Sequence, residues 1–351
     1  MRRRGFLAGA GATGLAGLAG CLGLLETERA SREPPLPENR PDAAYVPSHY
    51  EGMEMAGAQT KRGVSCVVSY TFPHRFWLVR DADTDRVNVK GADDLHLMVS
   101  VWDEAAGVVL AAASPQVEYT GPEGETESFS PWQMVSQRMG VHYGDNVTLG
   151  PEGVYDVTVR VPPPGTRRSG GDAPAEDVVE FDFELTFDNA VMDDLAFRDI
   201  PGDREGTEGA VDPMDMPGVA QSQAPAADDF PVDVNATAET GGARLVVAAV
   251  DSLGDLAAGD DETYLAASLR TPHNRFVLPA AGLAATVDAG GETAFDGELE
   301  PAVDPGLGYH YGAVVPAGGV DGGTVRVDTP PQVSRHEGYE TAFFDFEDVS
   351  L

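Results

Sequence analysis

Short runs of alternating apolar and polar residues predict an all-β protein. Residues 154–161 and 179–187 alternate β-branched or aromatic residues with polar ones, which is the period of a half-buried strand. Residues 95–102 are more continuously apolar, and Gly, Pro and Asp separate such runs along the chain. No window of a dozen residues carries a convincing helical stripe. We therefore expect strands and few helices from about residue 64 onward.

The strand-rich pattern occurs twice. Residues 139–147 (MGVHYGDNV) recur as residues 307–315 (LGYHYGAVV), at the shift that carries His142 onto His310. The apolar and proline positions that follow match at the same shift, and an FDFE segment ends both regions after loops of different length. An upstream Pro-His pair also occurs in both regions, as Pro73-His74 and Pro272-His273. The sequence thus predicts two immunoglobulin-like antiparallel β-sandwich domains that arose by duplication.

Composition divides the rest of the chain. A segment rich in Pro, Glu and Arg precedes the first strands and is typical of a flexible stalk. A Gly- and Pro-rich acidic segment without periodicity separates the two strand-rich regions. The expected parts are a signal peptide (1–21), a flexible stalk (22–44), a first immunoglobulin-like domain that binds metal (45–190), an acidic disordered linker (191–236) and a second immunoglobulin-like domain (237–351).

The N-terminus resembles an export signal. Residues 3–7 (RRGFL) are similar to the twin-arginine motif, and residues 8–20 form an apolar run that suits a signal peptide but is too short to span a membrane. Residues 18–21 (LAGC) resemble a lipobox, in which Cys21 becomes the lipidated first residue of the mature protein. The expected location is the extracytoplasmic face of the cell membrane, with a lipid anchor on Cys21.

Acidic residues dominate the charge. There are 23 Lys and Arg against 58 Asp and Glu, and removal of residues 1–20 with their three arginines would leave 20 − 58 = −38. A surface this acidic repels nucleic acid and anionic lipid headgroups, so neither is an expected partner. The acids are spread along the whole chain, which favours adaptation to strong brine over one dedicated cation site. With Cys21 lipidated, Cys66 is the only thiol, so no intrachain disulfide is expected.

Methionine is confined to the region before residue 217, although the fold is expected to repeat. His96 and Met98 lie two residues apart on a predicted strand, so their side chains share one face. Met134 and Met139 precede His142 in a loop that can fold back toward its imidazole. Imidazole and thioether together suit copper, above all Cu(I), and also Fe(II) when carboxylates join them. These residues are therefore candidate ligands of an iron or copper ion.

Each candidate also has a structural interpretation. His96 and Met98 fit a core face, and Met139 fits a plug at the end of the sandwich. Because His-Tyr-Gly occurs in both repeats, its shared part can be structural, with Gly in a tight turn and Tyr capping the core. His310 is for that reason a weaker candidate than His142. His336, next to an acidic residue, is expected in solvent.

Residues 134–147 (MVSQRMGVHYGDNV), with the Gly turn and strand that follow, resemble the periplasmic high-affinity iron-transport family (Fe2+ transport proteins, Tpd-like). These are immunoglobulin-like metal-binding proteins, some of them lipoproteins, and the chain looks like a haloarchaeal two-domain version. The family segment is M-V-A-x-D-G-P-H-Y-G-x-N-V, which implies that Met134 and His142 bind copper or iron. The segment here is one residue longer, so Met139 either replaces or joins Met134.

The same family carries an H-x-E pattern on an early strand. His74 fits the order of strands better, whereas His96 has the spacing but is followed by Met98 in place of Glu. The choice between them stays open. The last histidine ligand of the family has no counterpart in the first repeat.

No catalytic signature occurs, such as G-x-S-x-G, H-E-x-x-H or a phosphate-binding Gly loop, so we do not expect an enzyme. We expect a lipid-anchored protein that captures Fe(II), copper or both and delivers the ion to a membrane iron permease. The alternative is a structural or adhesive surface lipoprotein without a metal role; a redox or copper-resistance protein ranks third. Convergence of His74 or His96 with a methionine and His142 would favour metal binding. The sequence leaves open whether two copies form a homodimer.

Overall fold

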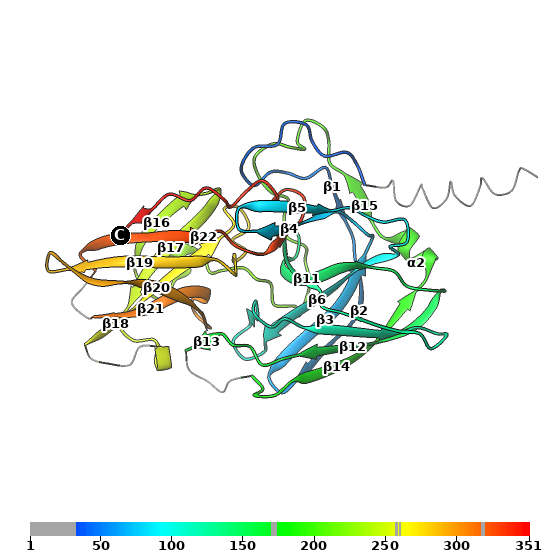
Figure 1. Ribbon diagram of the computed structural model, residues 1–351, viewed down its shortest axis with the longest axis horizontal. Helices are drawn as coiled ribbons and strands as arrows, with labels where there is room; N and C mark the ends of the chain where they lie inside the picture. The colour runs from blue at the N-terminus through cyan, green and yellow to red at the C-terminus, as the bar shows by residue number, and fades with distance from the viewer. Residues whose placement is uncertain (1–32, 170–173, 257–258, 260, 317–319) are drawn as a thin grey trace, which may run out of the picture.

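The computed structural model describes residues 33–169, 174–256, 259, 261–316 and 320–351. It is built of strands, with one short helix, α2 (Asn189–Asp194), and two 3-10 turns, η1 (Ala227–Asp229) and η2 (Gly254–Leu256). The strands form two packed bodies that lie side by side (Figure 1), so the all-β fold class is confirmed. No helix of the described residues is long and apolar enough to cross a membrane. The predicted signal peptide and Cys21 lie outside the described residues.

The first half is built around two sheets, beside a small two-stranded one, β1 (His49–Glu51) with β15 (Phe197–Asp199). The larger has the order β2-β3-β6-β11-β10-β23-β4-β5, with β7 beside β6, and the smaller has the order β14-β12-β8-β9. The larger sheet comprises β2 (Glu54–Lys61), β3 (Val64–Thr71), β6 (Leu95–Asp103), β11 (Gly140–Val147), β10 (Trp132–Ser136), β23 (Ser334–Arg335), β4 (Phe76–Arg80), β5 (Asp83–Val87) and β7 (Val108–Val109). The smaller comprises β14 (Val179–Phe187), β12 (Gly153–Val161), β8 (Gln116–Thr120) and β9 (Thr126–Phe129).

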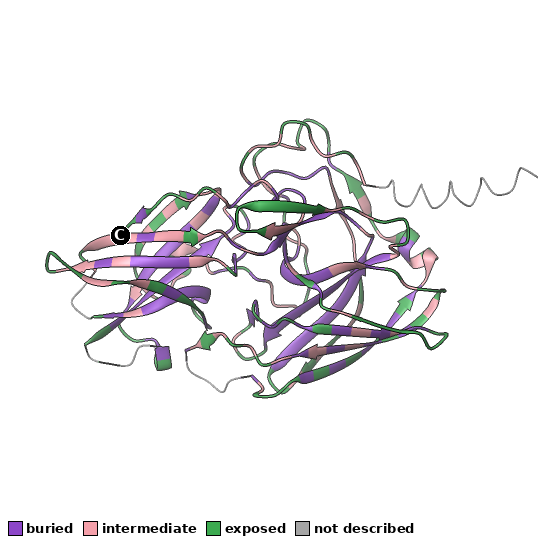
Figure 2. Ribbon diagram, viewed as in Figure 1, coloured by how far each residue is buried: buried purple, intermediate pink, exposed green. Residues whose placement is uncertain are grey.

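The core of the first half lies between these sheets. On β12 and β14 every second residue is buried, as their alternation predicts (Figure 2). Every residue of β3 and β6 is buried, because the face of the larger sheet that points away from this core is covered as well. Cys66 is a free thiol inside the core, where burial raises its pKa and keeps it protonated.

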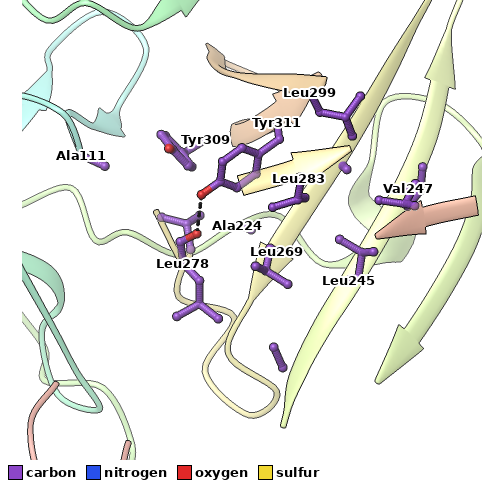
Figure 3. Close-up of a cluster of buried hydrophobic side chains, with 14 of the residues drawn as sticks. Ala111, Ala224, Leu245, Val247, Leu269, Leu278, Leu283, Leu299, Tyr309 and Tyr311 are labelled. Carbon is purple, nitrogen blue, oxygen red and sulfur yellow. Dashed lines mark hydrogen bonds between the residues drawn. The ribbon is translucent and has the colours of Figure 1, made fainter. Parts of the chain in front are cut away.

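The second half is one sheet with the order β16-β17-β18-β21-β20-β19-β22-β24, and β13 joins it at β20. Its strands are β16 (Val234–Thr240), β17 (Ala243–Val250), β18 (Glu262–Arg270), β21 (Gly308–Pro316), β20 (Glu292–Asp304), β19 (Gly282–Ala289), β22 (Gly322–Thr329), β24 (Val349–Ser350) and β13 (Arg167–Arg168). The long β20 pairs with β21 near one end and with β19 near the other, which folds the sheet around its own core. Leu245, Leu269 and Leu283 pack there around Tyr311 (Figure 3).

Equivalent hydrogen bonds in the two halves support the predicted duplication. The hydroxyl of Tyr143 donates to the Leu110 carbonyl at 3.0 Å, and that of Tyr311 donates to the Leu278 carbonyl at 2.9 Å (Figure 3). Donor and acceptor are related by the same shift as the sequence repeat, because Tyr143 and Tyr311 are as far apart in the chain as Leu110 and Leu278. The shift seen in the sequence therefore aligns β11 with β21 and also the loops beside them.

The two halves exchange short strands. β13 leaves the first half and pairs in parallel with β20, so that Arg167 lies beside Ala302. β23 leaves the second half and pairs in parallel with β10, so that Met134 lies beside Ser334. Each half therefore completes a sheet of the other. The exchange carries residue 336 to the outer face of the first half's larger sheet.

Segments expected to be disordered lie against this face. The predicted disordered linker, 191–236, instead follows a defined path: β15 (Phe197–Asp199) pairs with β1 (His49–Glu51), and Ile200, Val211 and Met216 are buried. Of the predicted stalk, residues 33–44 are described, and Glu33 accepts a hydrogen bond from the amide of Arg75. A few apolar and paired side chains anchor these segments despite their polar, Pro-rich composition. Overall composition cannot detect such isolated contacts.

Candidate metal centre

Three histidine side chains meet on the outer face of the first half's larger sheet. The ligand atoms of His74, His96 and His336 all lie within 4.8 Å of one another. The ring centroid of His74 is 4.1 Å from that of His96 and 4.7 Å from that of His336. His142 adjoins them, with its ring centroid 5.0 Å from that of His336. Imidazoles that converge in this way form a common ligand set for copper, zinc and iron.

Two neighbouring strands carry two of these histidines. His96 lies on β6 and His142 on β11, and Gly144 separates them on the shared face. A Cβ atom at Gly144 would lie 2.5 Å from His96 Nε2, so only glycine leaves room for the imidazole. The Gly of His-Tyr-Gly therefore does not form the tight turn that the sequence suggested. It lies within β11, and the ring of His96 occupies the space that a side chain at this position would take.

Asn146 orients two histidines at once. Its Nδ2 donates to the His74 carbonyl at 2.9 Å, so its Oδ1 faces the other way. That oxygen accepts from the His74 amide at 3.3 Å and lies 2.8 Å from His96 Nδ1. Because Oδ1 only accepts hydrogen bonds, the Nδ1 of His96 carries the proton and its Nε2 carries the lone pair.

The same tautomer follows for two more rings. Nδ1 of His74 lies 3.1 Å from the Phe72 carbonyl, and Nδ1 of His142 lies 3.0 Å from the Gly140 carbonyl. Both Nδ1 atoms must donate, which leaves the lone pair on Nε2 in the neutral form of each ring. The Nε2 atoms of His74, His96, His142 and His336 are all buried without a hydrogen-bond partner. Buried polar atoms are rarely unsatisfied, and histidines held at Nδ1 by a carbonyl are typical metal ligands.

The carboxylate of Glu51 lies between two histidines. Glu51 Oε2 is 3.5 Å from His74 Nδ1, and Glu51 Oε1 is 3.4 Å from His49 Nε2. Burial raises the pKa of Glu51, but its hydrogen bonds to His49 and His74 outweigh this and lower it overall. Burial lowers the pKa of His74, but the hydrogen bond and charge of Glu51 outweigh this and raise it. At neutral pH this carboxylate is ionised beside the ring of His74.

The other three histidines are neutral at pH 7. Burial, together with the neighbouring rings, lowers the pKa of His96 and of His336 well below the usual value. Burial also lowers the pKa of His142 to about 4. Neutral imidazoles keep their lone pairs free for a cation over the physiological pH range.

His49-Tyr50-Glu51 on β1 is an H-x-E pattern on an early strand that the sequence analysis missed. Its spacing was the signal, and it stands near the start of the expected first domain, 45–190. The structure brings Glu51 to His74, and the rings of His74 and His96, the two alternatives from the sequence, lie beside each other.

His336 was expected in solvent because Glu337 follows it, and this expectation was wrong. Glu337 is itself buried: its Oε2 lies 2.5 Å from Arg75 Nη2, and its Oε1 accepts from the Ser48 amide at 2.7 Å. This pair holds the chain after β23 against the first half. The second half therefore supplies one of the histidines that converge at this face.

The candidate methionines divide into two groups. Met134 is the register partner of His142 across the β10–β11 ladder, so the two buried side chains share a face with Cβ atoms about 5 Å apart. Met98 and Met139 pack together in a separate cluster. The structure thus brings Met134 to His142 and Met139 to Met98; which of them bind an ion stays a prediction.

The matching positions of the second half hold an apolar cluster. Under the shift of the sequence repeat, the residues that replace His96, Met134 and Met139 pack together; they are Tyr264, Ala302 and Leu307.

His310 occupies the position of His142, but its Nε2 lies 3.2 Å from the hydroxyl of Tyr264 and is satisfied by it. Gly312 makes room for that tyrosine, since a Cβ there would lie 2.2 Å from the hydroxyl oxygen. His273, which the sequence matched with His74, is exposed after β18, whereas His74 follows β3. Among the described residues, the unsatisfied imidazoles are His74, His96 and His142 of the first half and His336 of the second, and all four lie at the first half's larger sheet.

Comparisons with known proteins cover parts of the chain. Residues 228–351 match a domain of unknown function (DUF7350). No curated protein matches the chain. A copper-bound variant of FetP from uropathogenic Escherichia coli strain F11 is 19% identical, over 38% of this chain and 97% of that one, with a TM-score of 0.31. The copper-reconstituted P19 protein from Campylobacter jejuni is 15% identical, over 39% and 96%, also with a TM-score of 0.31. At this level of similarity, the function of this chain has to be argued from its own residues.

Proposed function

We propose that this protein binds a copper or iron ion at the centre formed by His74, His96, His142 and His336. The observation that carries the proposal is that four buried Nε2 atoms converge without a hydrogen-bond partner. Each unsatisfied buried polar atom costs about 1–3 kcal/mol, and an ion that accepts these lone pairs removes that cost. The protein has no catalytic role in this proposal.

The ligand chemistry favours copper. Imidazole binds Cu(I), Cu(II) and Fe(II), and a thioether from Met134 beside His142 adds a soft donor that suits Cu(I). The carboxylate of Glu51 contacts His49 and His74, and a harder ion such as Fe(II) would draw on its oxygens. Copper is therefore the first expectation and Fe(II) the second.

A structural or adhesive protein is the alternative. That interpretation requires the histidines to be satisfied in separate cores, as His310 is in the second half. The convergence of His74, His96 and His336 argues against it for the first half. Burying four imidazoles without partners brings a purely structural domain no stability.

We further propose that the protein works outside the cytoplasmic membrane, anchored by a lipid on Cys21, and delivers its ion to a membrane permease. Neutral imidazole and thioether ligands suit such a task because they release an ion more readily than a cage of thiolates. A pocket lined by His74 and His336 leads from the surface to the centre and supports exchange with a partner.

Calorimetric titration of the metal-stripped full chain tests the binding proposal. Cu(II), Cu(I) and Fe(II) are titrated separately, the last two without oxygen. We expect His142→Gln to weaken binding of the preferred ion at least tenfold. His310→Gln is the matched control, because it removes the equivalent ring of the second half, and it should leave the affinity unchanged. Equal affinities of the wild type and His142→Gln, or no saturable binding by any of the three ions, would overturn the proposal.

A further inference from the structure

Five methionines from four separate segments meet beside the histidine centre. Met98 lies on β6, Met139 in the β10–β11 turn, Met53 between β1 and β2, and Met214 and Met216 after β15. Met98, Met139 and Met216 are buried and the other two are partly buried. Val219 is the only other apolar residue of this cluster among the described residues. We call these five methionines the methionine cluster.

Ordinary core packing does not account for this composition. Apolar cores are built mainly from Leu, Ile, Val and Phe, and Met serves as an occasional gap filler. In the second half, which repeats the fold, Ala266 and Leu307 occupy the positions of Met98 and Met139. The same backbone therefore packs without thioethers where no histidine centre adjoins it.

The methionine cluster and the histidine centre open into one pocket. Met53, Met98, Met139 and Met214 line it together with His74, His336 and Glu51, in a cavity of about 100 Å³. That space holds several waters or a hydrated ion. The thioethers therefore lie where an ion entering from the surface toward the imidazoles would pass.

The segment that carries two of the methionines is fixed over the site. The Met214 amide donates to the Arg138 carbonyl at 2.8 Å, and the Val219 amide donates to the Met216 carbonyl at 3.1 Å. The guanidinium of Arg138 lies 4.8 Å from the ring centroid of Tyr50. The thioethers are thus brought together by the fold before any ion is present, which reduces the entropic cost of binding one.

We propose that the methionine cluster is a second metal site, which takes Cu(I) through thioether sulfur alone. Thioethers are soft ligands that bind Cu(I) well, and an ion held by thioether donors alone is more favourable as Cu(I) than as Fe(II), Zn(II) or Cu(II). This inference stands without the proposed function; only the further step, transfer of Cu(I) from the methionine cluster to His74 and His336, rests on it.

Silver(I), a redox-inert probe for Cu(I), separates the two sites. The metal-stripped full chain is titrated calorimetrically with Ag(I) as nitrate in chloride-free buffer, in two variants. His142→Gln/His336→Gln weakens the histidine centre and should retain one Ag(I) site. Met98→Leu/Met139→Leu/Met214→Leu removes thioethers at nearly constant volume and should lose that site, with affinity reduced at least a hundredfold. Met192→Leu, a buried methionine outside the cluster, is the matched control and should bind as the wild type does.

The outcomes distinguish this inference from the proposed function. If the histidine variant binds no Ag(I), or if the triple leucine variant binds it as well as the wild type, the methionine site is overturned. If the wild type fails to bind Cu(II) and Fe(II) but takes one Ag(I) lost in the leucine variant, the histidine proposal fails and the methionine site stands.

A measurement on the unmutated chain covers the case in which the leucine variant does not fold. In protein labelled with ¹³C at the methionine methyl groups, Ag(I) should shift the resonances of the five cluster methionines. Met55, exposed on β2, and Met192 should not move. Shifts confined to methionines outside the cluster, or no shift at all, would overturn the site.

Discussion

Two equivalent histidines, His142 and His310, differ in whether a hydroxyl group is hydrogen-bonded to their Nε2 atom. His142 and His310 both lie 3.0 Å, through Nδ1, from a carbonyl two residues earlier. The Nε2 of His310 is satisfied by Tyr264, whereas the Nε2 of His142 has no hydrogen-bond partner. The same residue in the same turn is therefore a packing group in one half and a candidate ligand in the other.

The metal-free protein should become less stable as the pH is lowered, because several of its histidines are buried in the neutral form. His96, His142 and His336 have lowered pKa values, about 4 for His142. Below pH 6.5 the unfolded chain binds protons at these rings that the folded chain does not. The free energy of unfolding then decreases as the pH falls from about 6.5 toward 4, by up to about 1.4 kcal/mol per pH unit for each ring. Urea unfolding across this range at constant salt measures it.

His74 has the opposite effect on the pH dependence of the unfolding free energy. Its raised pKa adds stability that is fully present below about pH 6.5 and is lost as the pH rises through the folded value, so it offsets part of the acid loss. The variant His142→Gln should show a shallower decrease between pH 6.5 and 4 than the wild type. His273→Gln, at an exposed position, serves as the control. An equal slope in the wild type and His142→Gln would contradict this account.

At the scale of elements, the turn between β10 and β11 sets the position of His142. Gly140 has φ +70° and its carbonyl accepts the bond from His142 Nδ1. The corresponding Gly308 has φ +73° and the same bond to His310. The surroundings differ. A Cβ at Gly140 would lie 2.1 Å from Ser222 Oγ, whereas one at Gly308 would have no neighbour closer than 3.4 Å.

Alanine at these two glycines should therefore have unequal effects. Gly308→Ala introduces only the left-handed backbone conformation, which costs about 1–2 kcal/mol. Gly140→Ala adds the clash with Ser222 and Phe276, so its loss of stability should be larger by at least about 1 kcal/mol. It should also weaken metal binding because the Gly140 carbonyl shifts. Thermal unfolding and metal titration measure both effects; equal losses in the two variants would contradict the packing argument.

The local sequence pattern predicted which segments form strands. It often did not predict where a segment lies in the fold. Alternation identified β12 and β14 because one face of each lies in the core and the other in solvent. Residues 200–226 have no period, since isolated apolar residues such as Val211 and Met216 anchor them, so their composition predicts disorder. The short exchanged strands β13 and β23 are two residues long and leave no pattern at all.

At the scale of the whole molecule, a buried ion pair joins the two halves beside the histidine centre. Arg75 of the first half and Glu337 of the second are 2.5 Å apart, with both side chains 8% exposed. Glu337 also accepts from the Ser48 amide. No local pattern predicts this contact, because its members are 262 residues apart. The sequence could name His74, His96 and His142 but could not bring His336 to them for the same reason.

Removing one member of this pair should weaken both the fold and the site. Glu337→Gln leaves the buried guanidinium of Arg75 without its nearest carboxylate, which we expect to cost about 3 kcal/mol of unfolding free energy. The displacement of His336 should weaken metal binding at least tenfold. Asp85→Asn, in the exposed pair of Arg80 and Asp85, is the control and should cost less than about 1 kcal/mol. Denaturant unfolding and metal titration test both; a Glu337→Gln variant as stable as the control would contradict the role of the pair.

The origin of His336 in the second half has a consequence for the stability of the metal-loaded chain. Exported proteins are commonly stabilised by disulfide bonds, yet Cys66, the only cysteine among the described residues, is a buried free thiol. An ion shared by His74 and His336 would close a loop that contains most of the chain, and so act as a cross-link. In chain-entropy terms so long a closure restricts the unfolded chain by about 5 kcal/mol. Unlike a disulfide, this cross-link would be removed whenever the ion left the site.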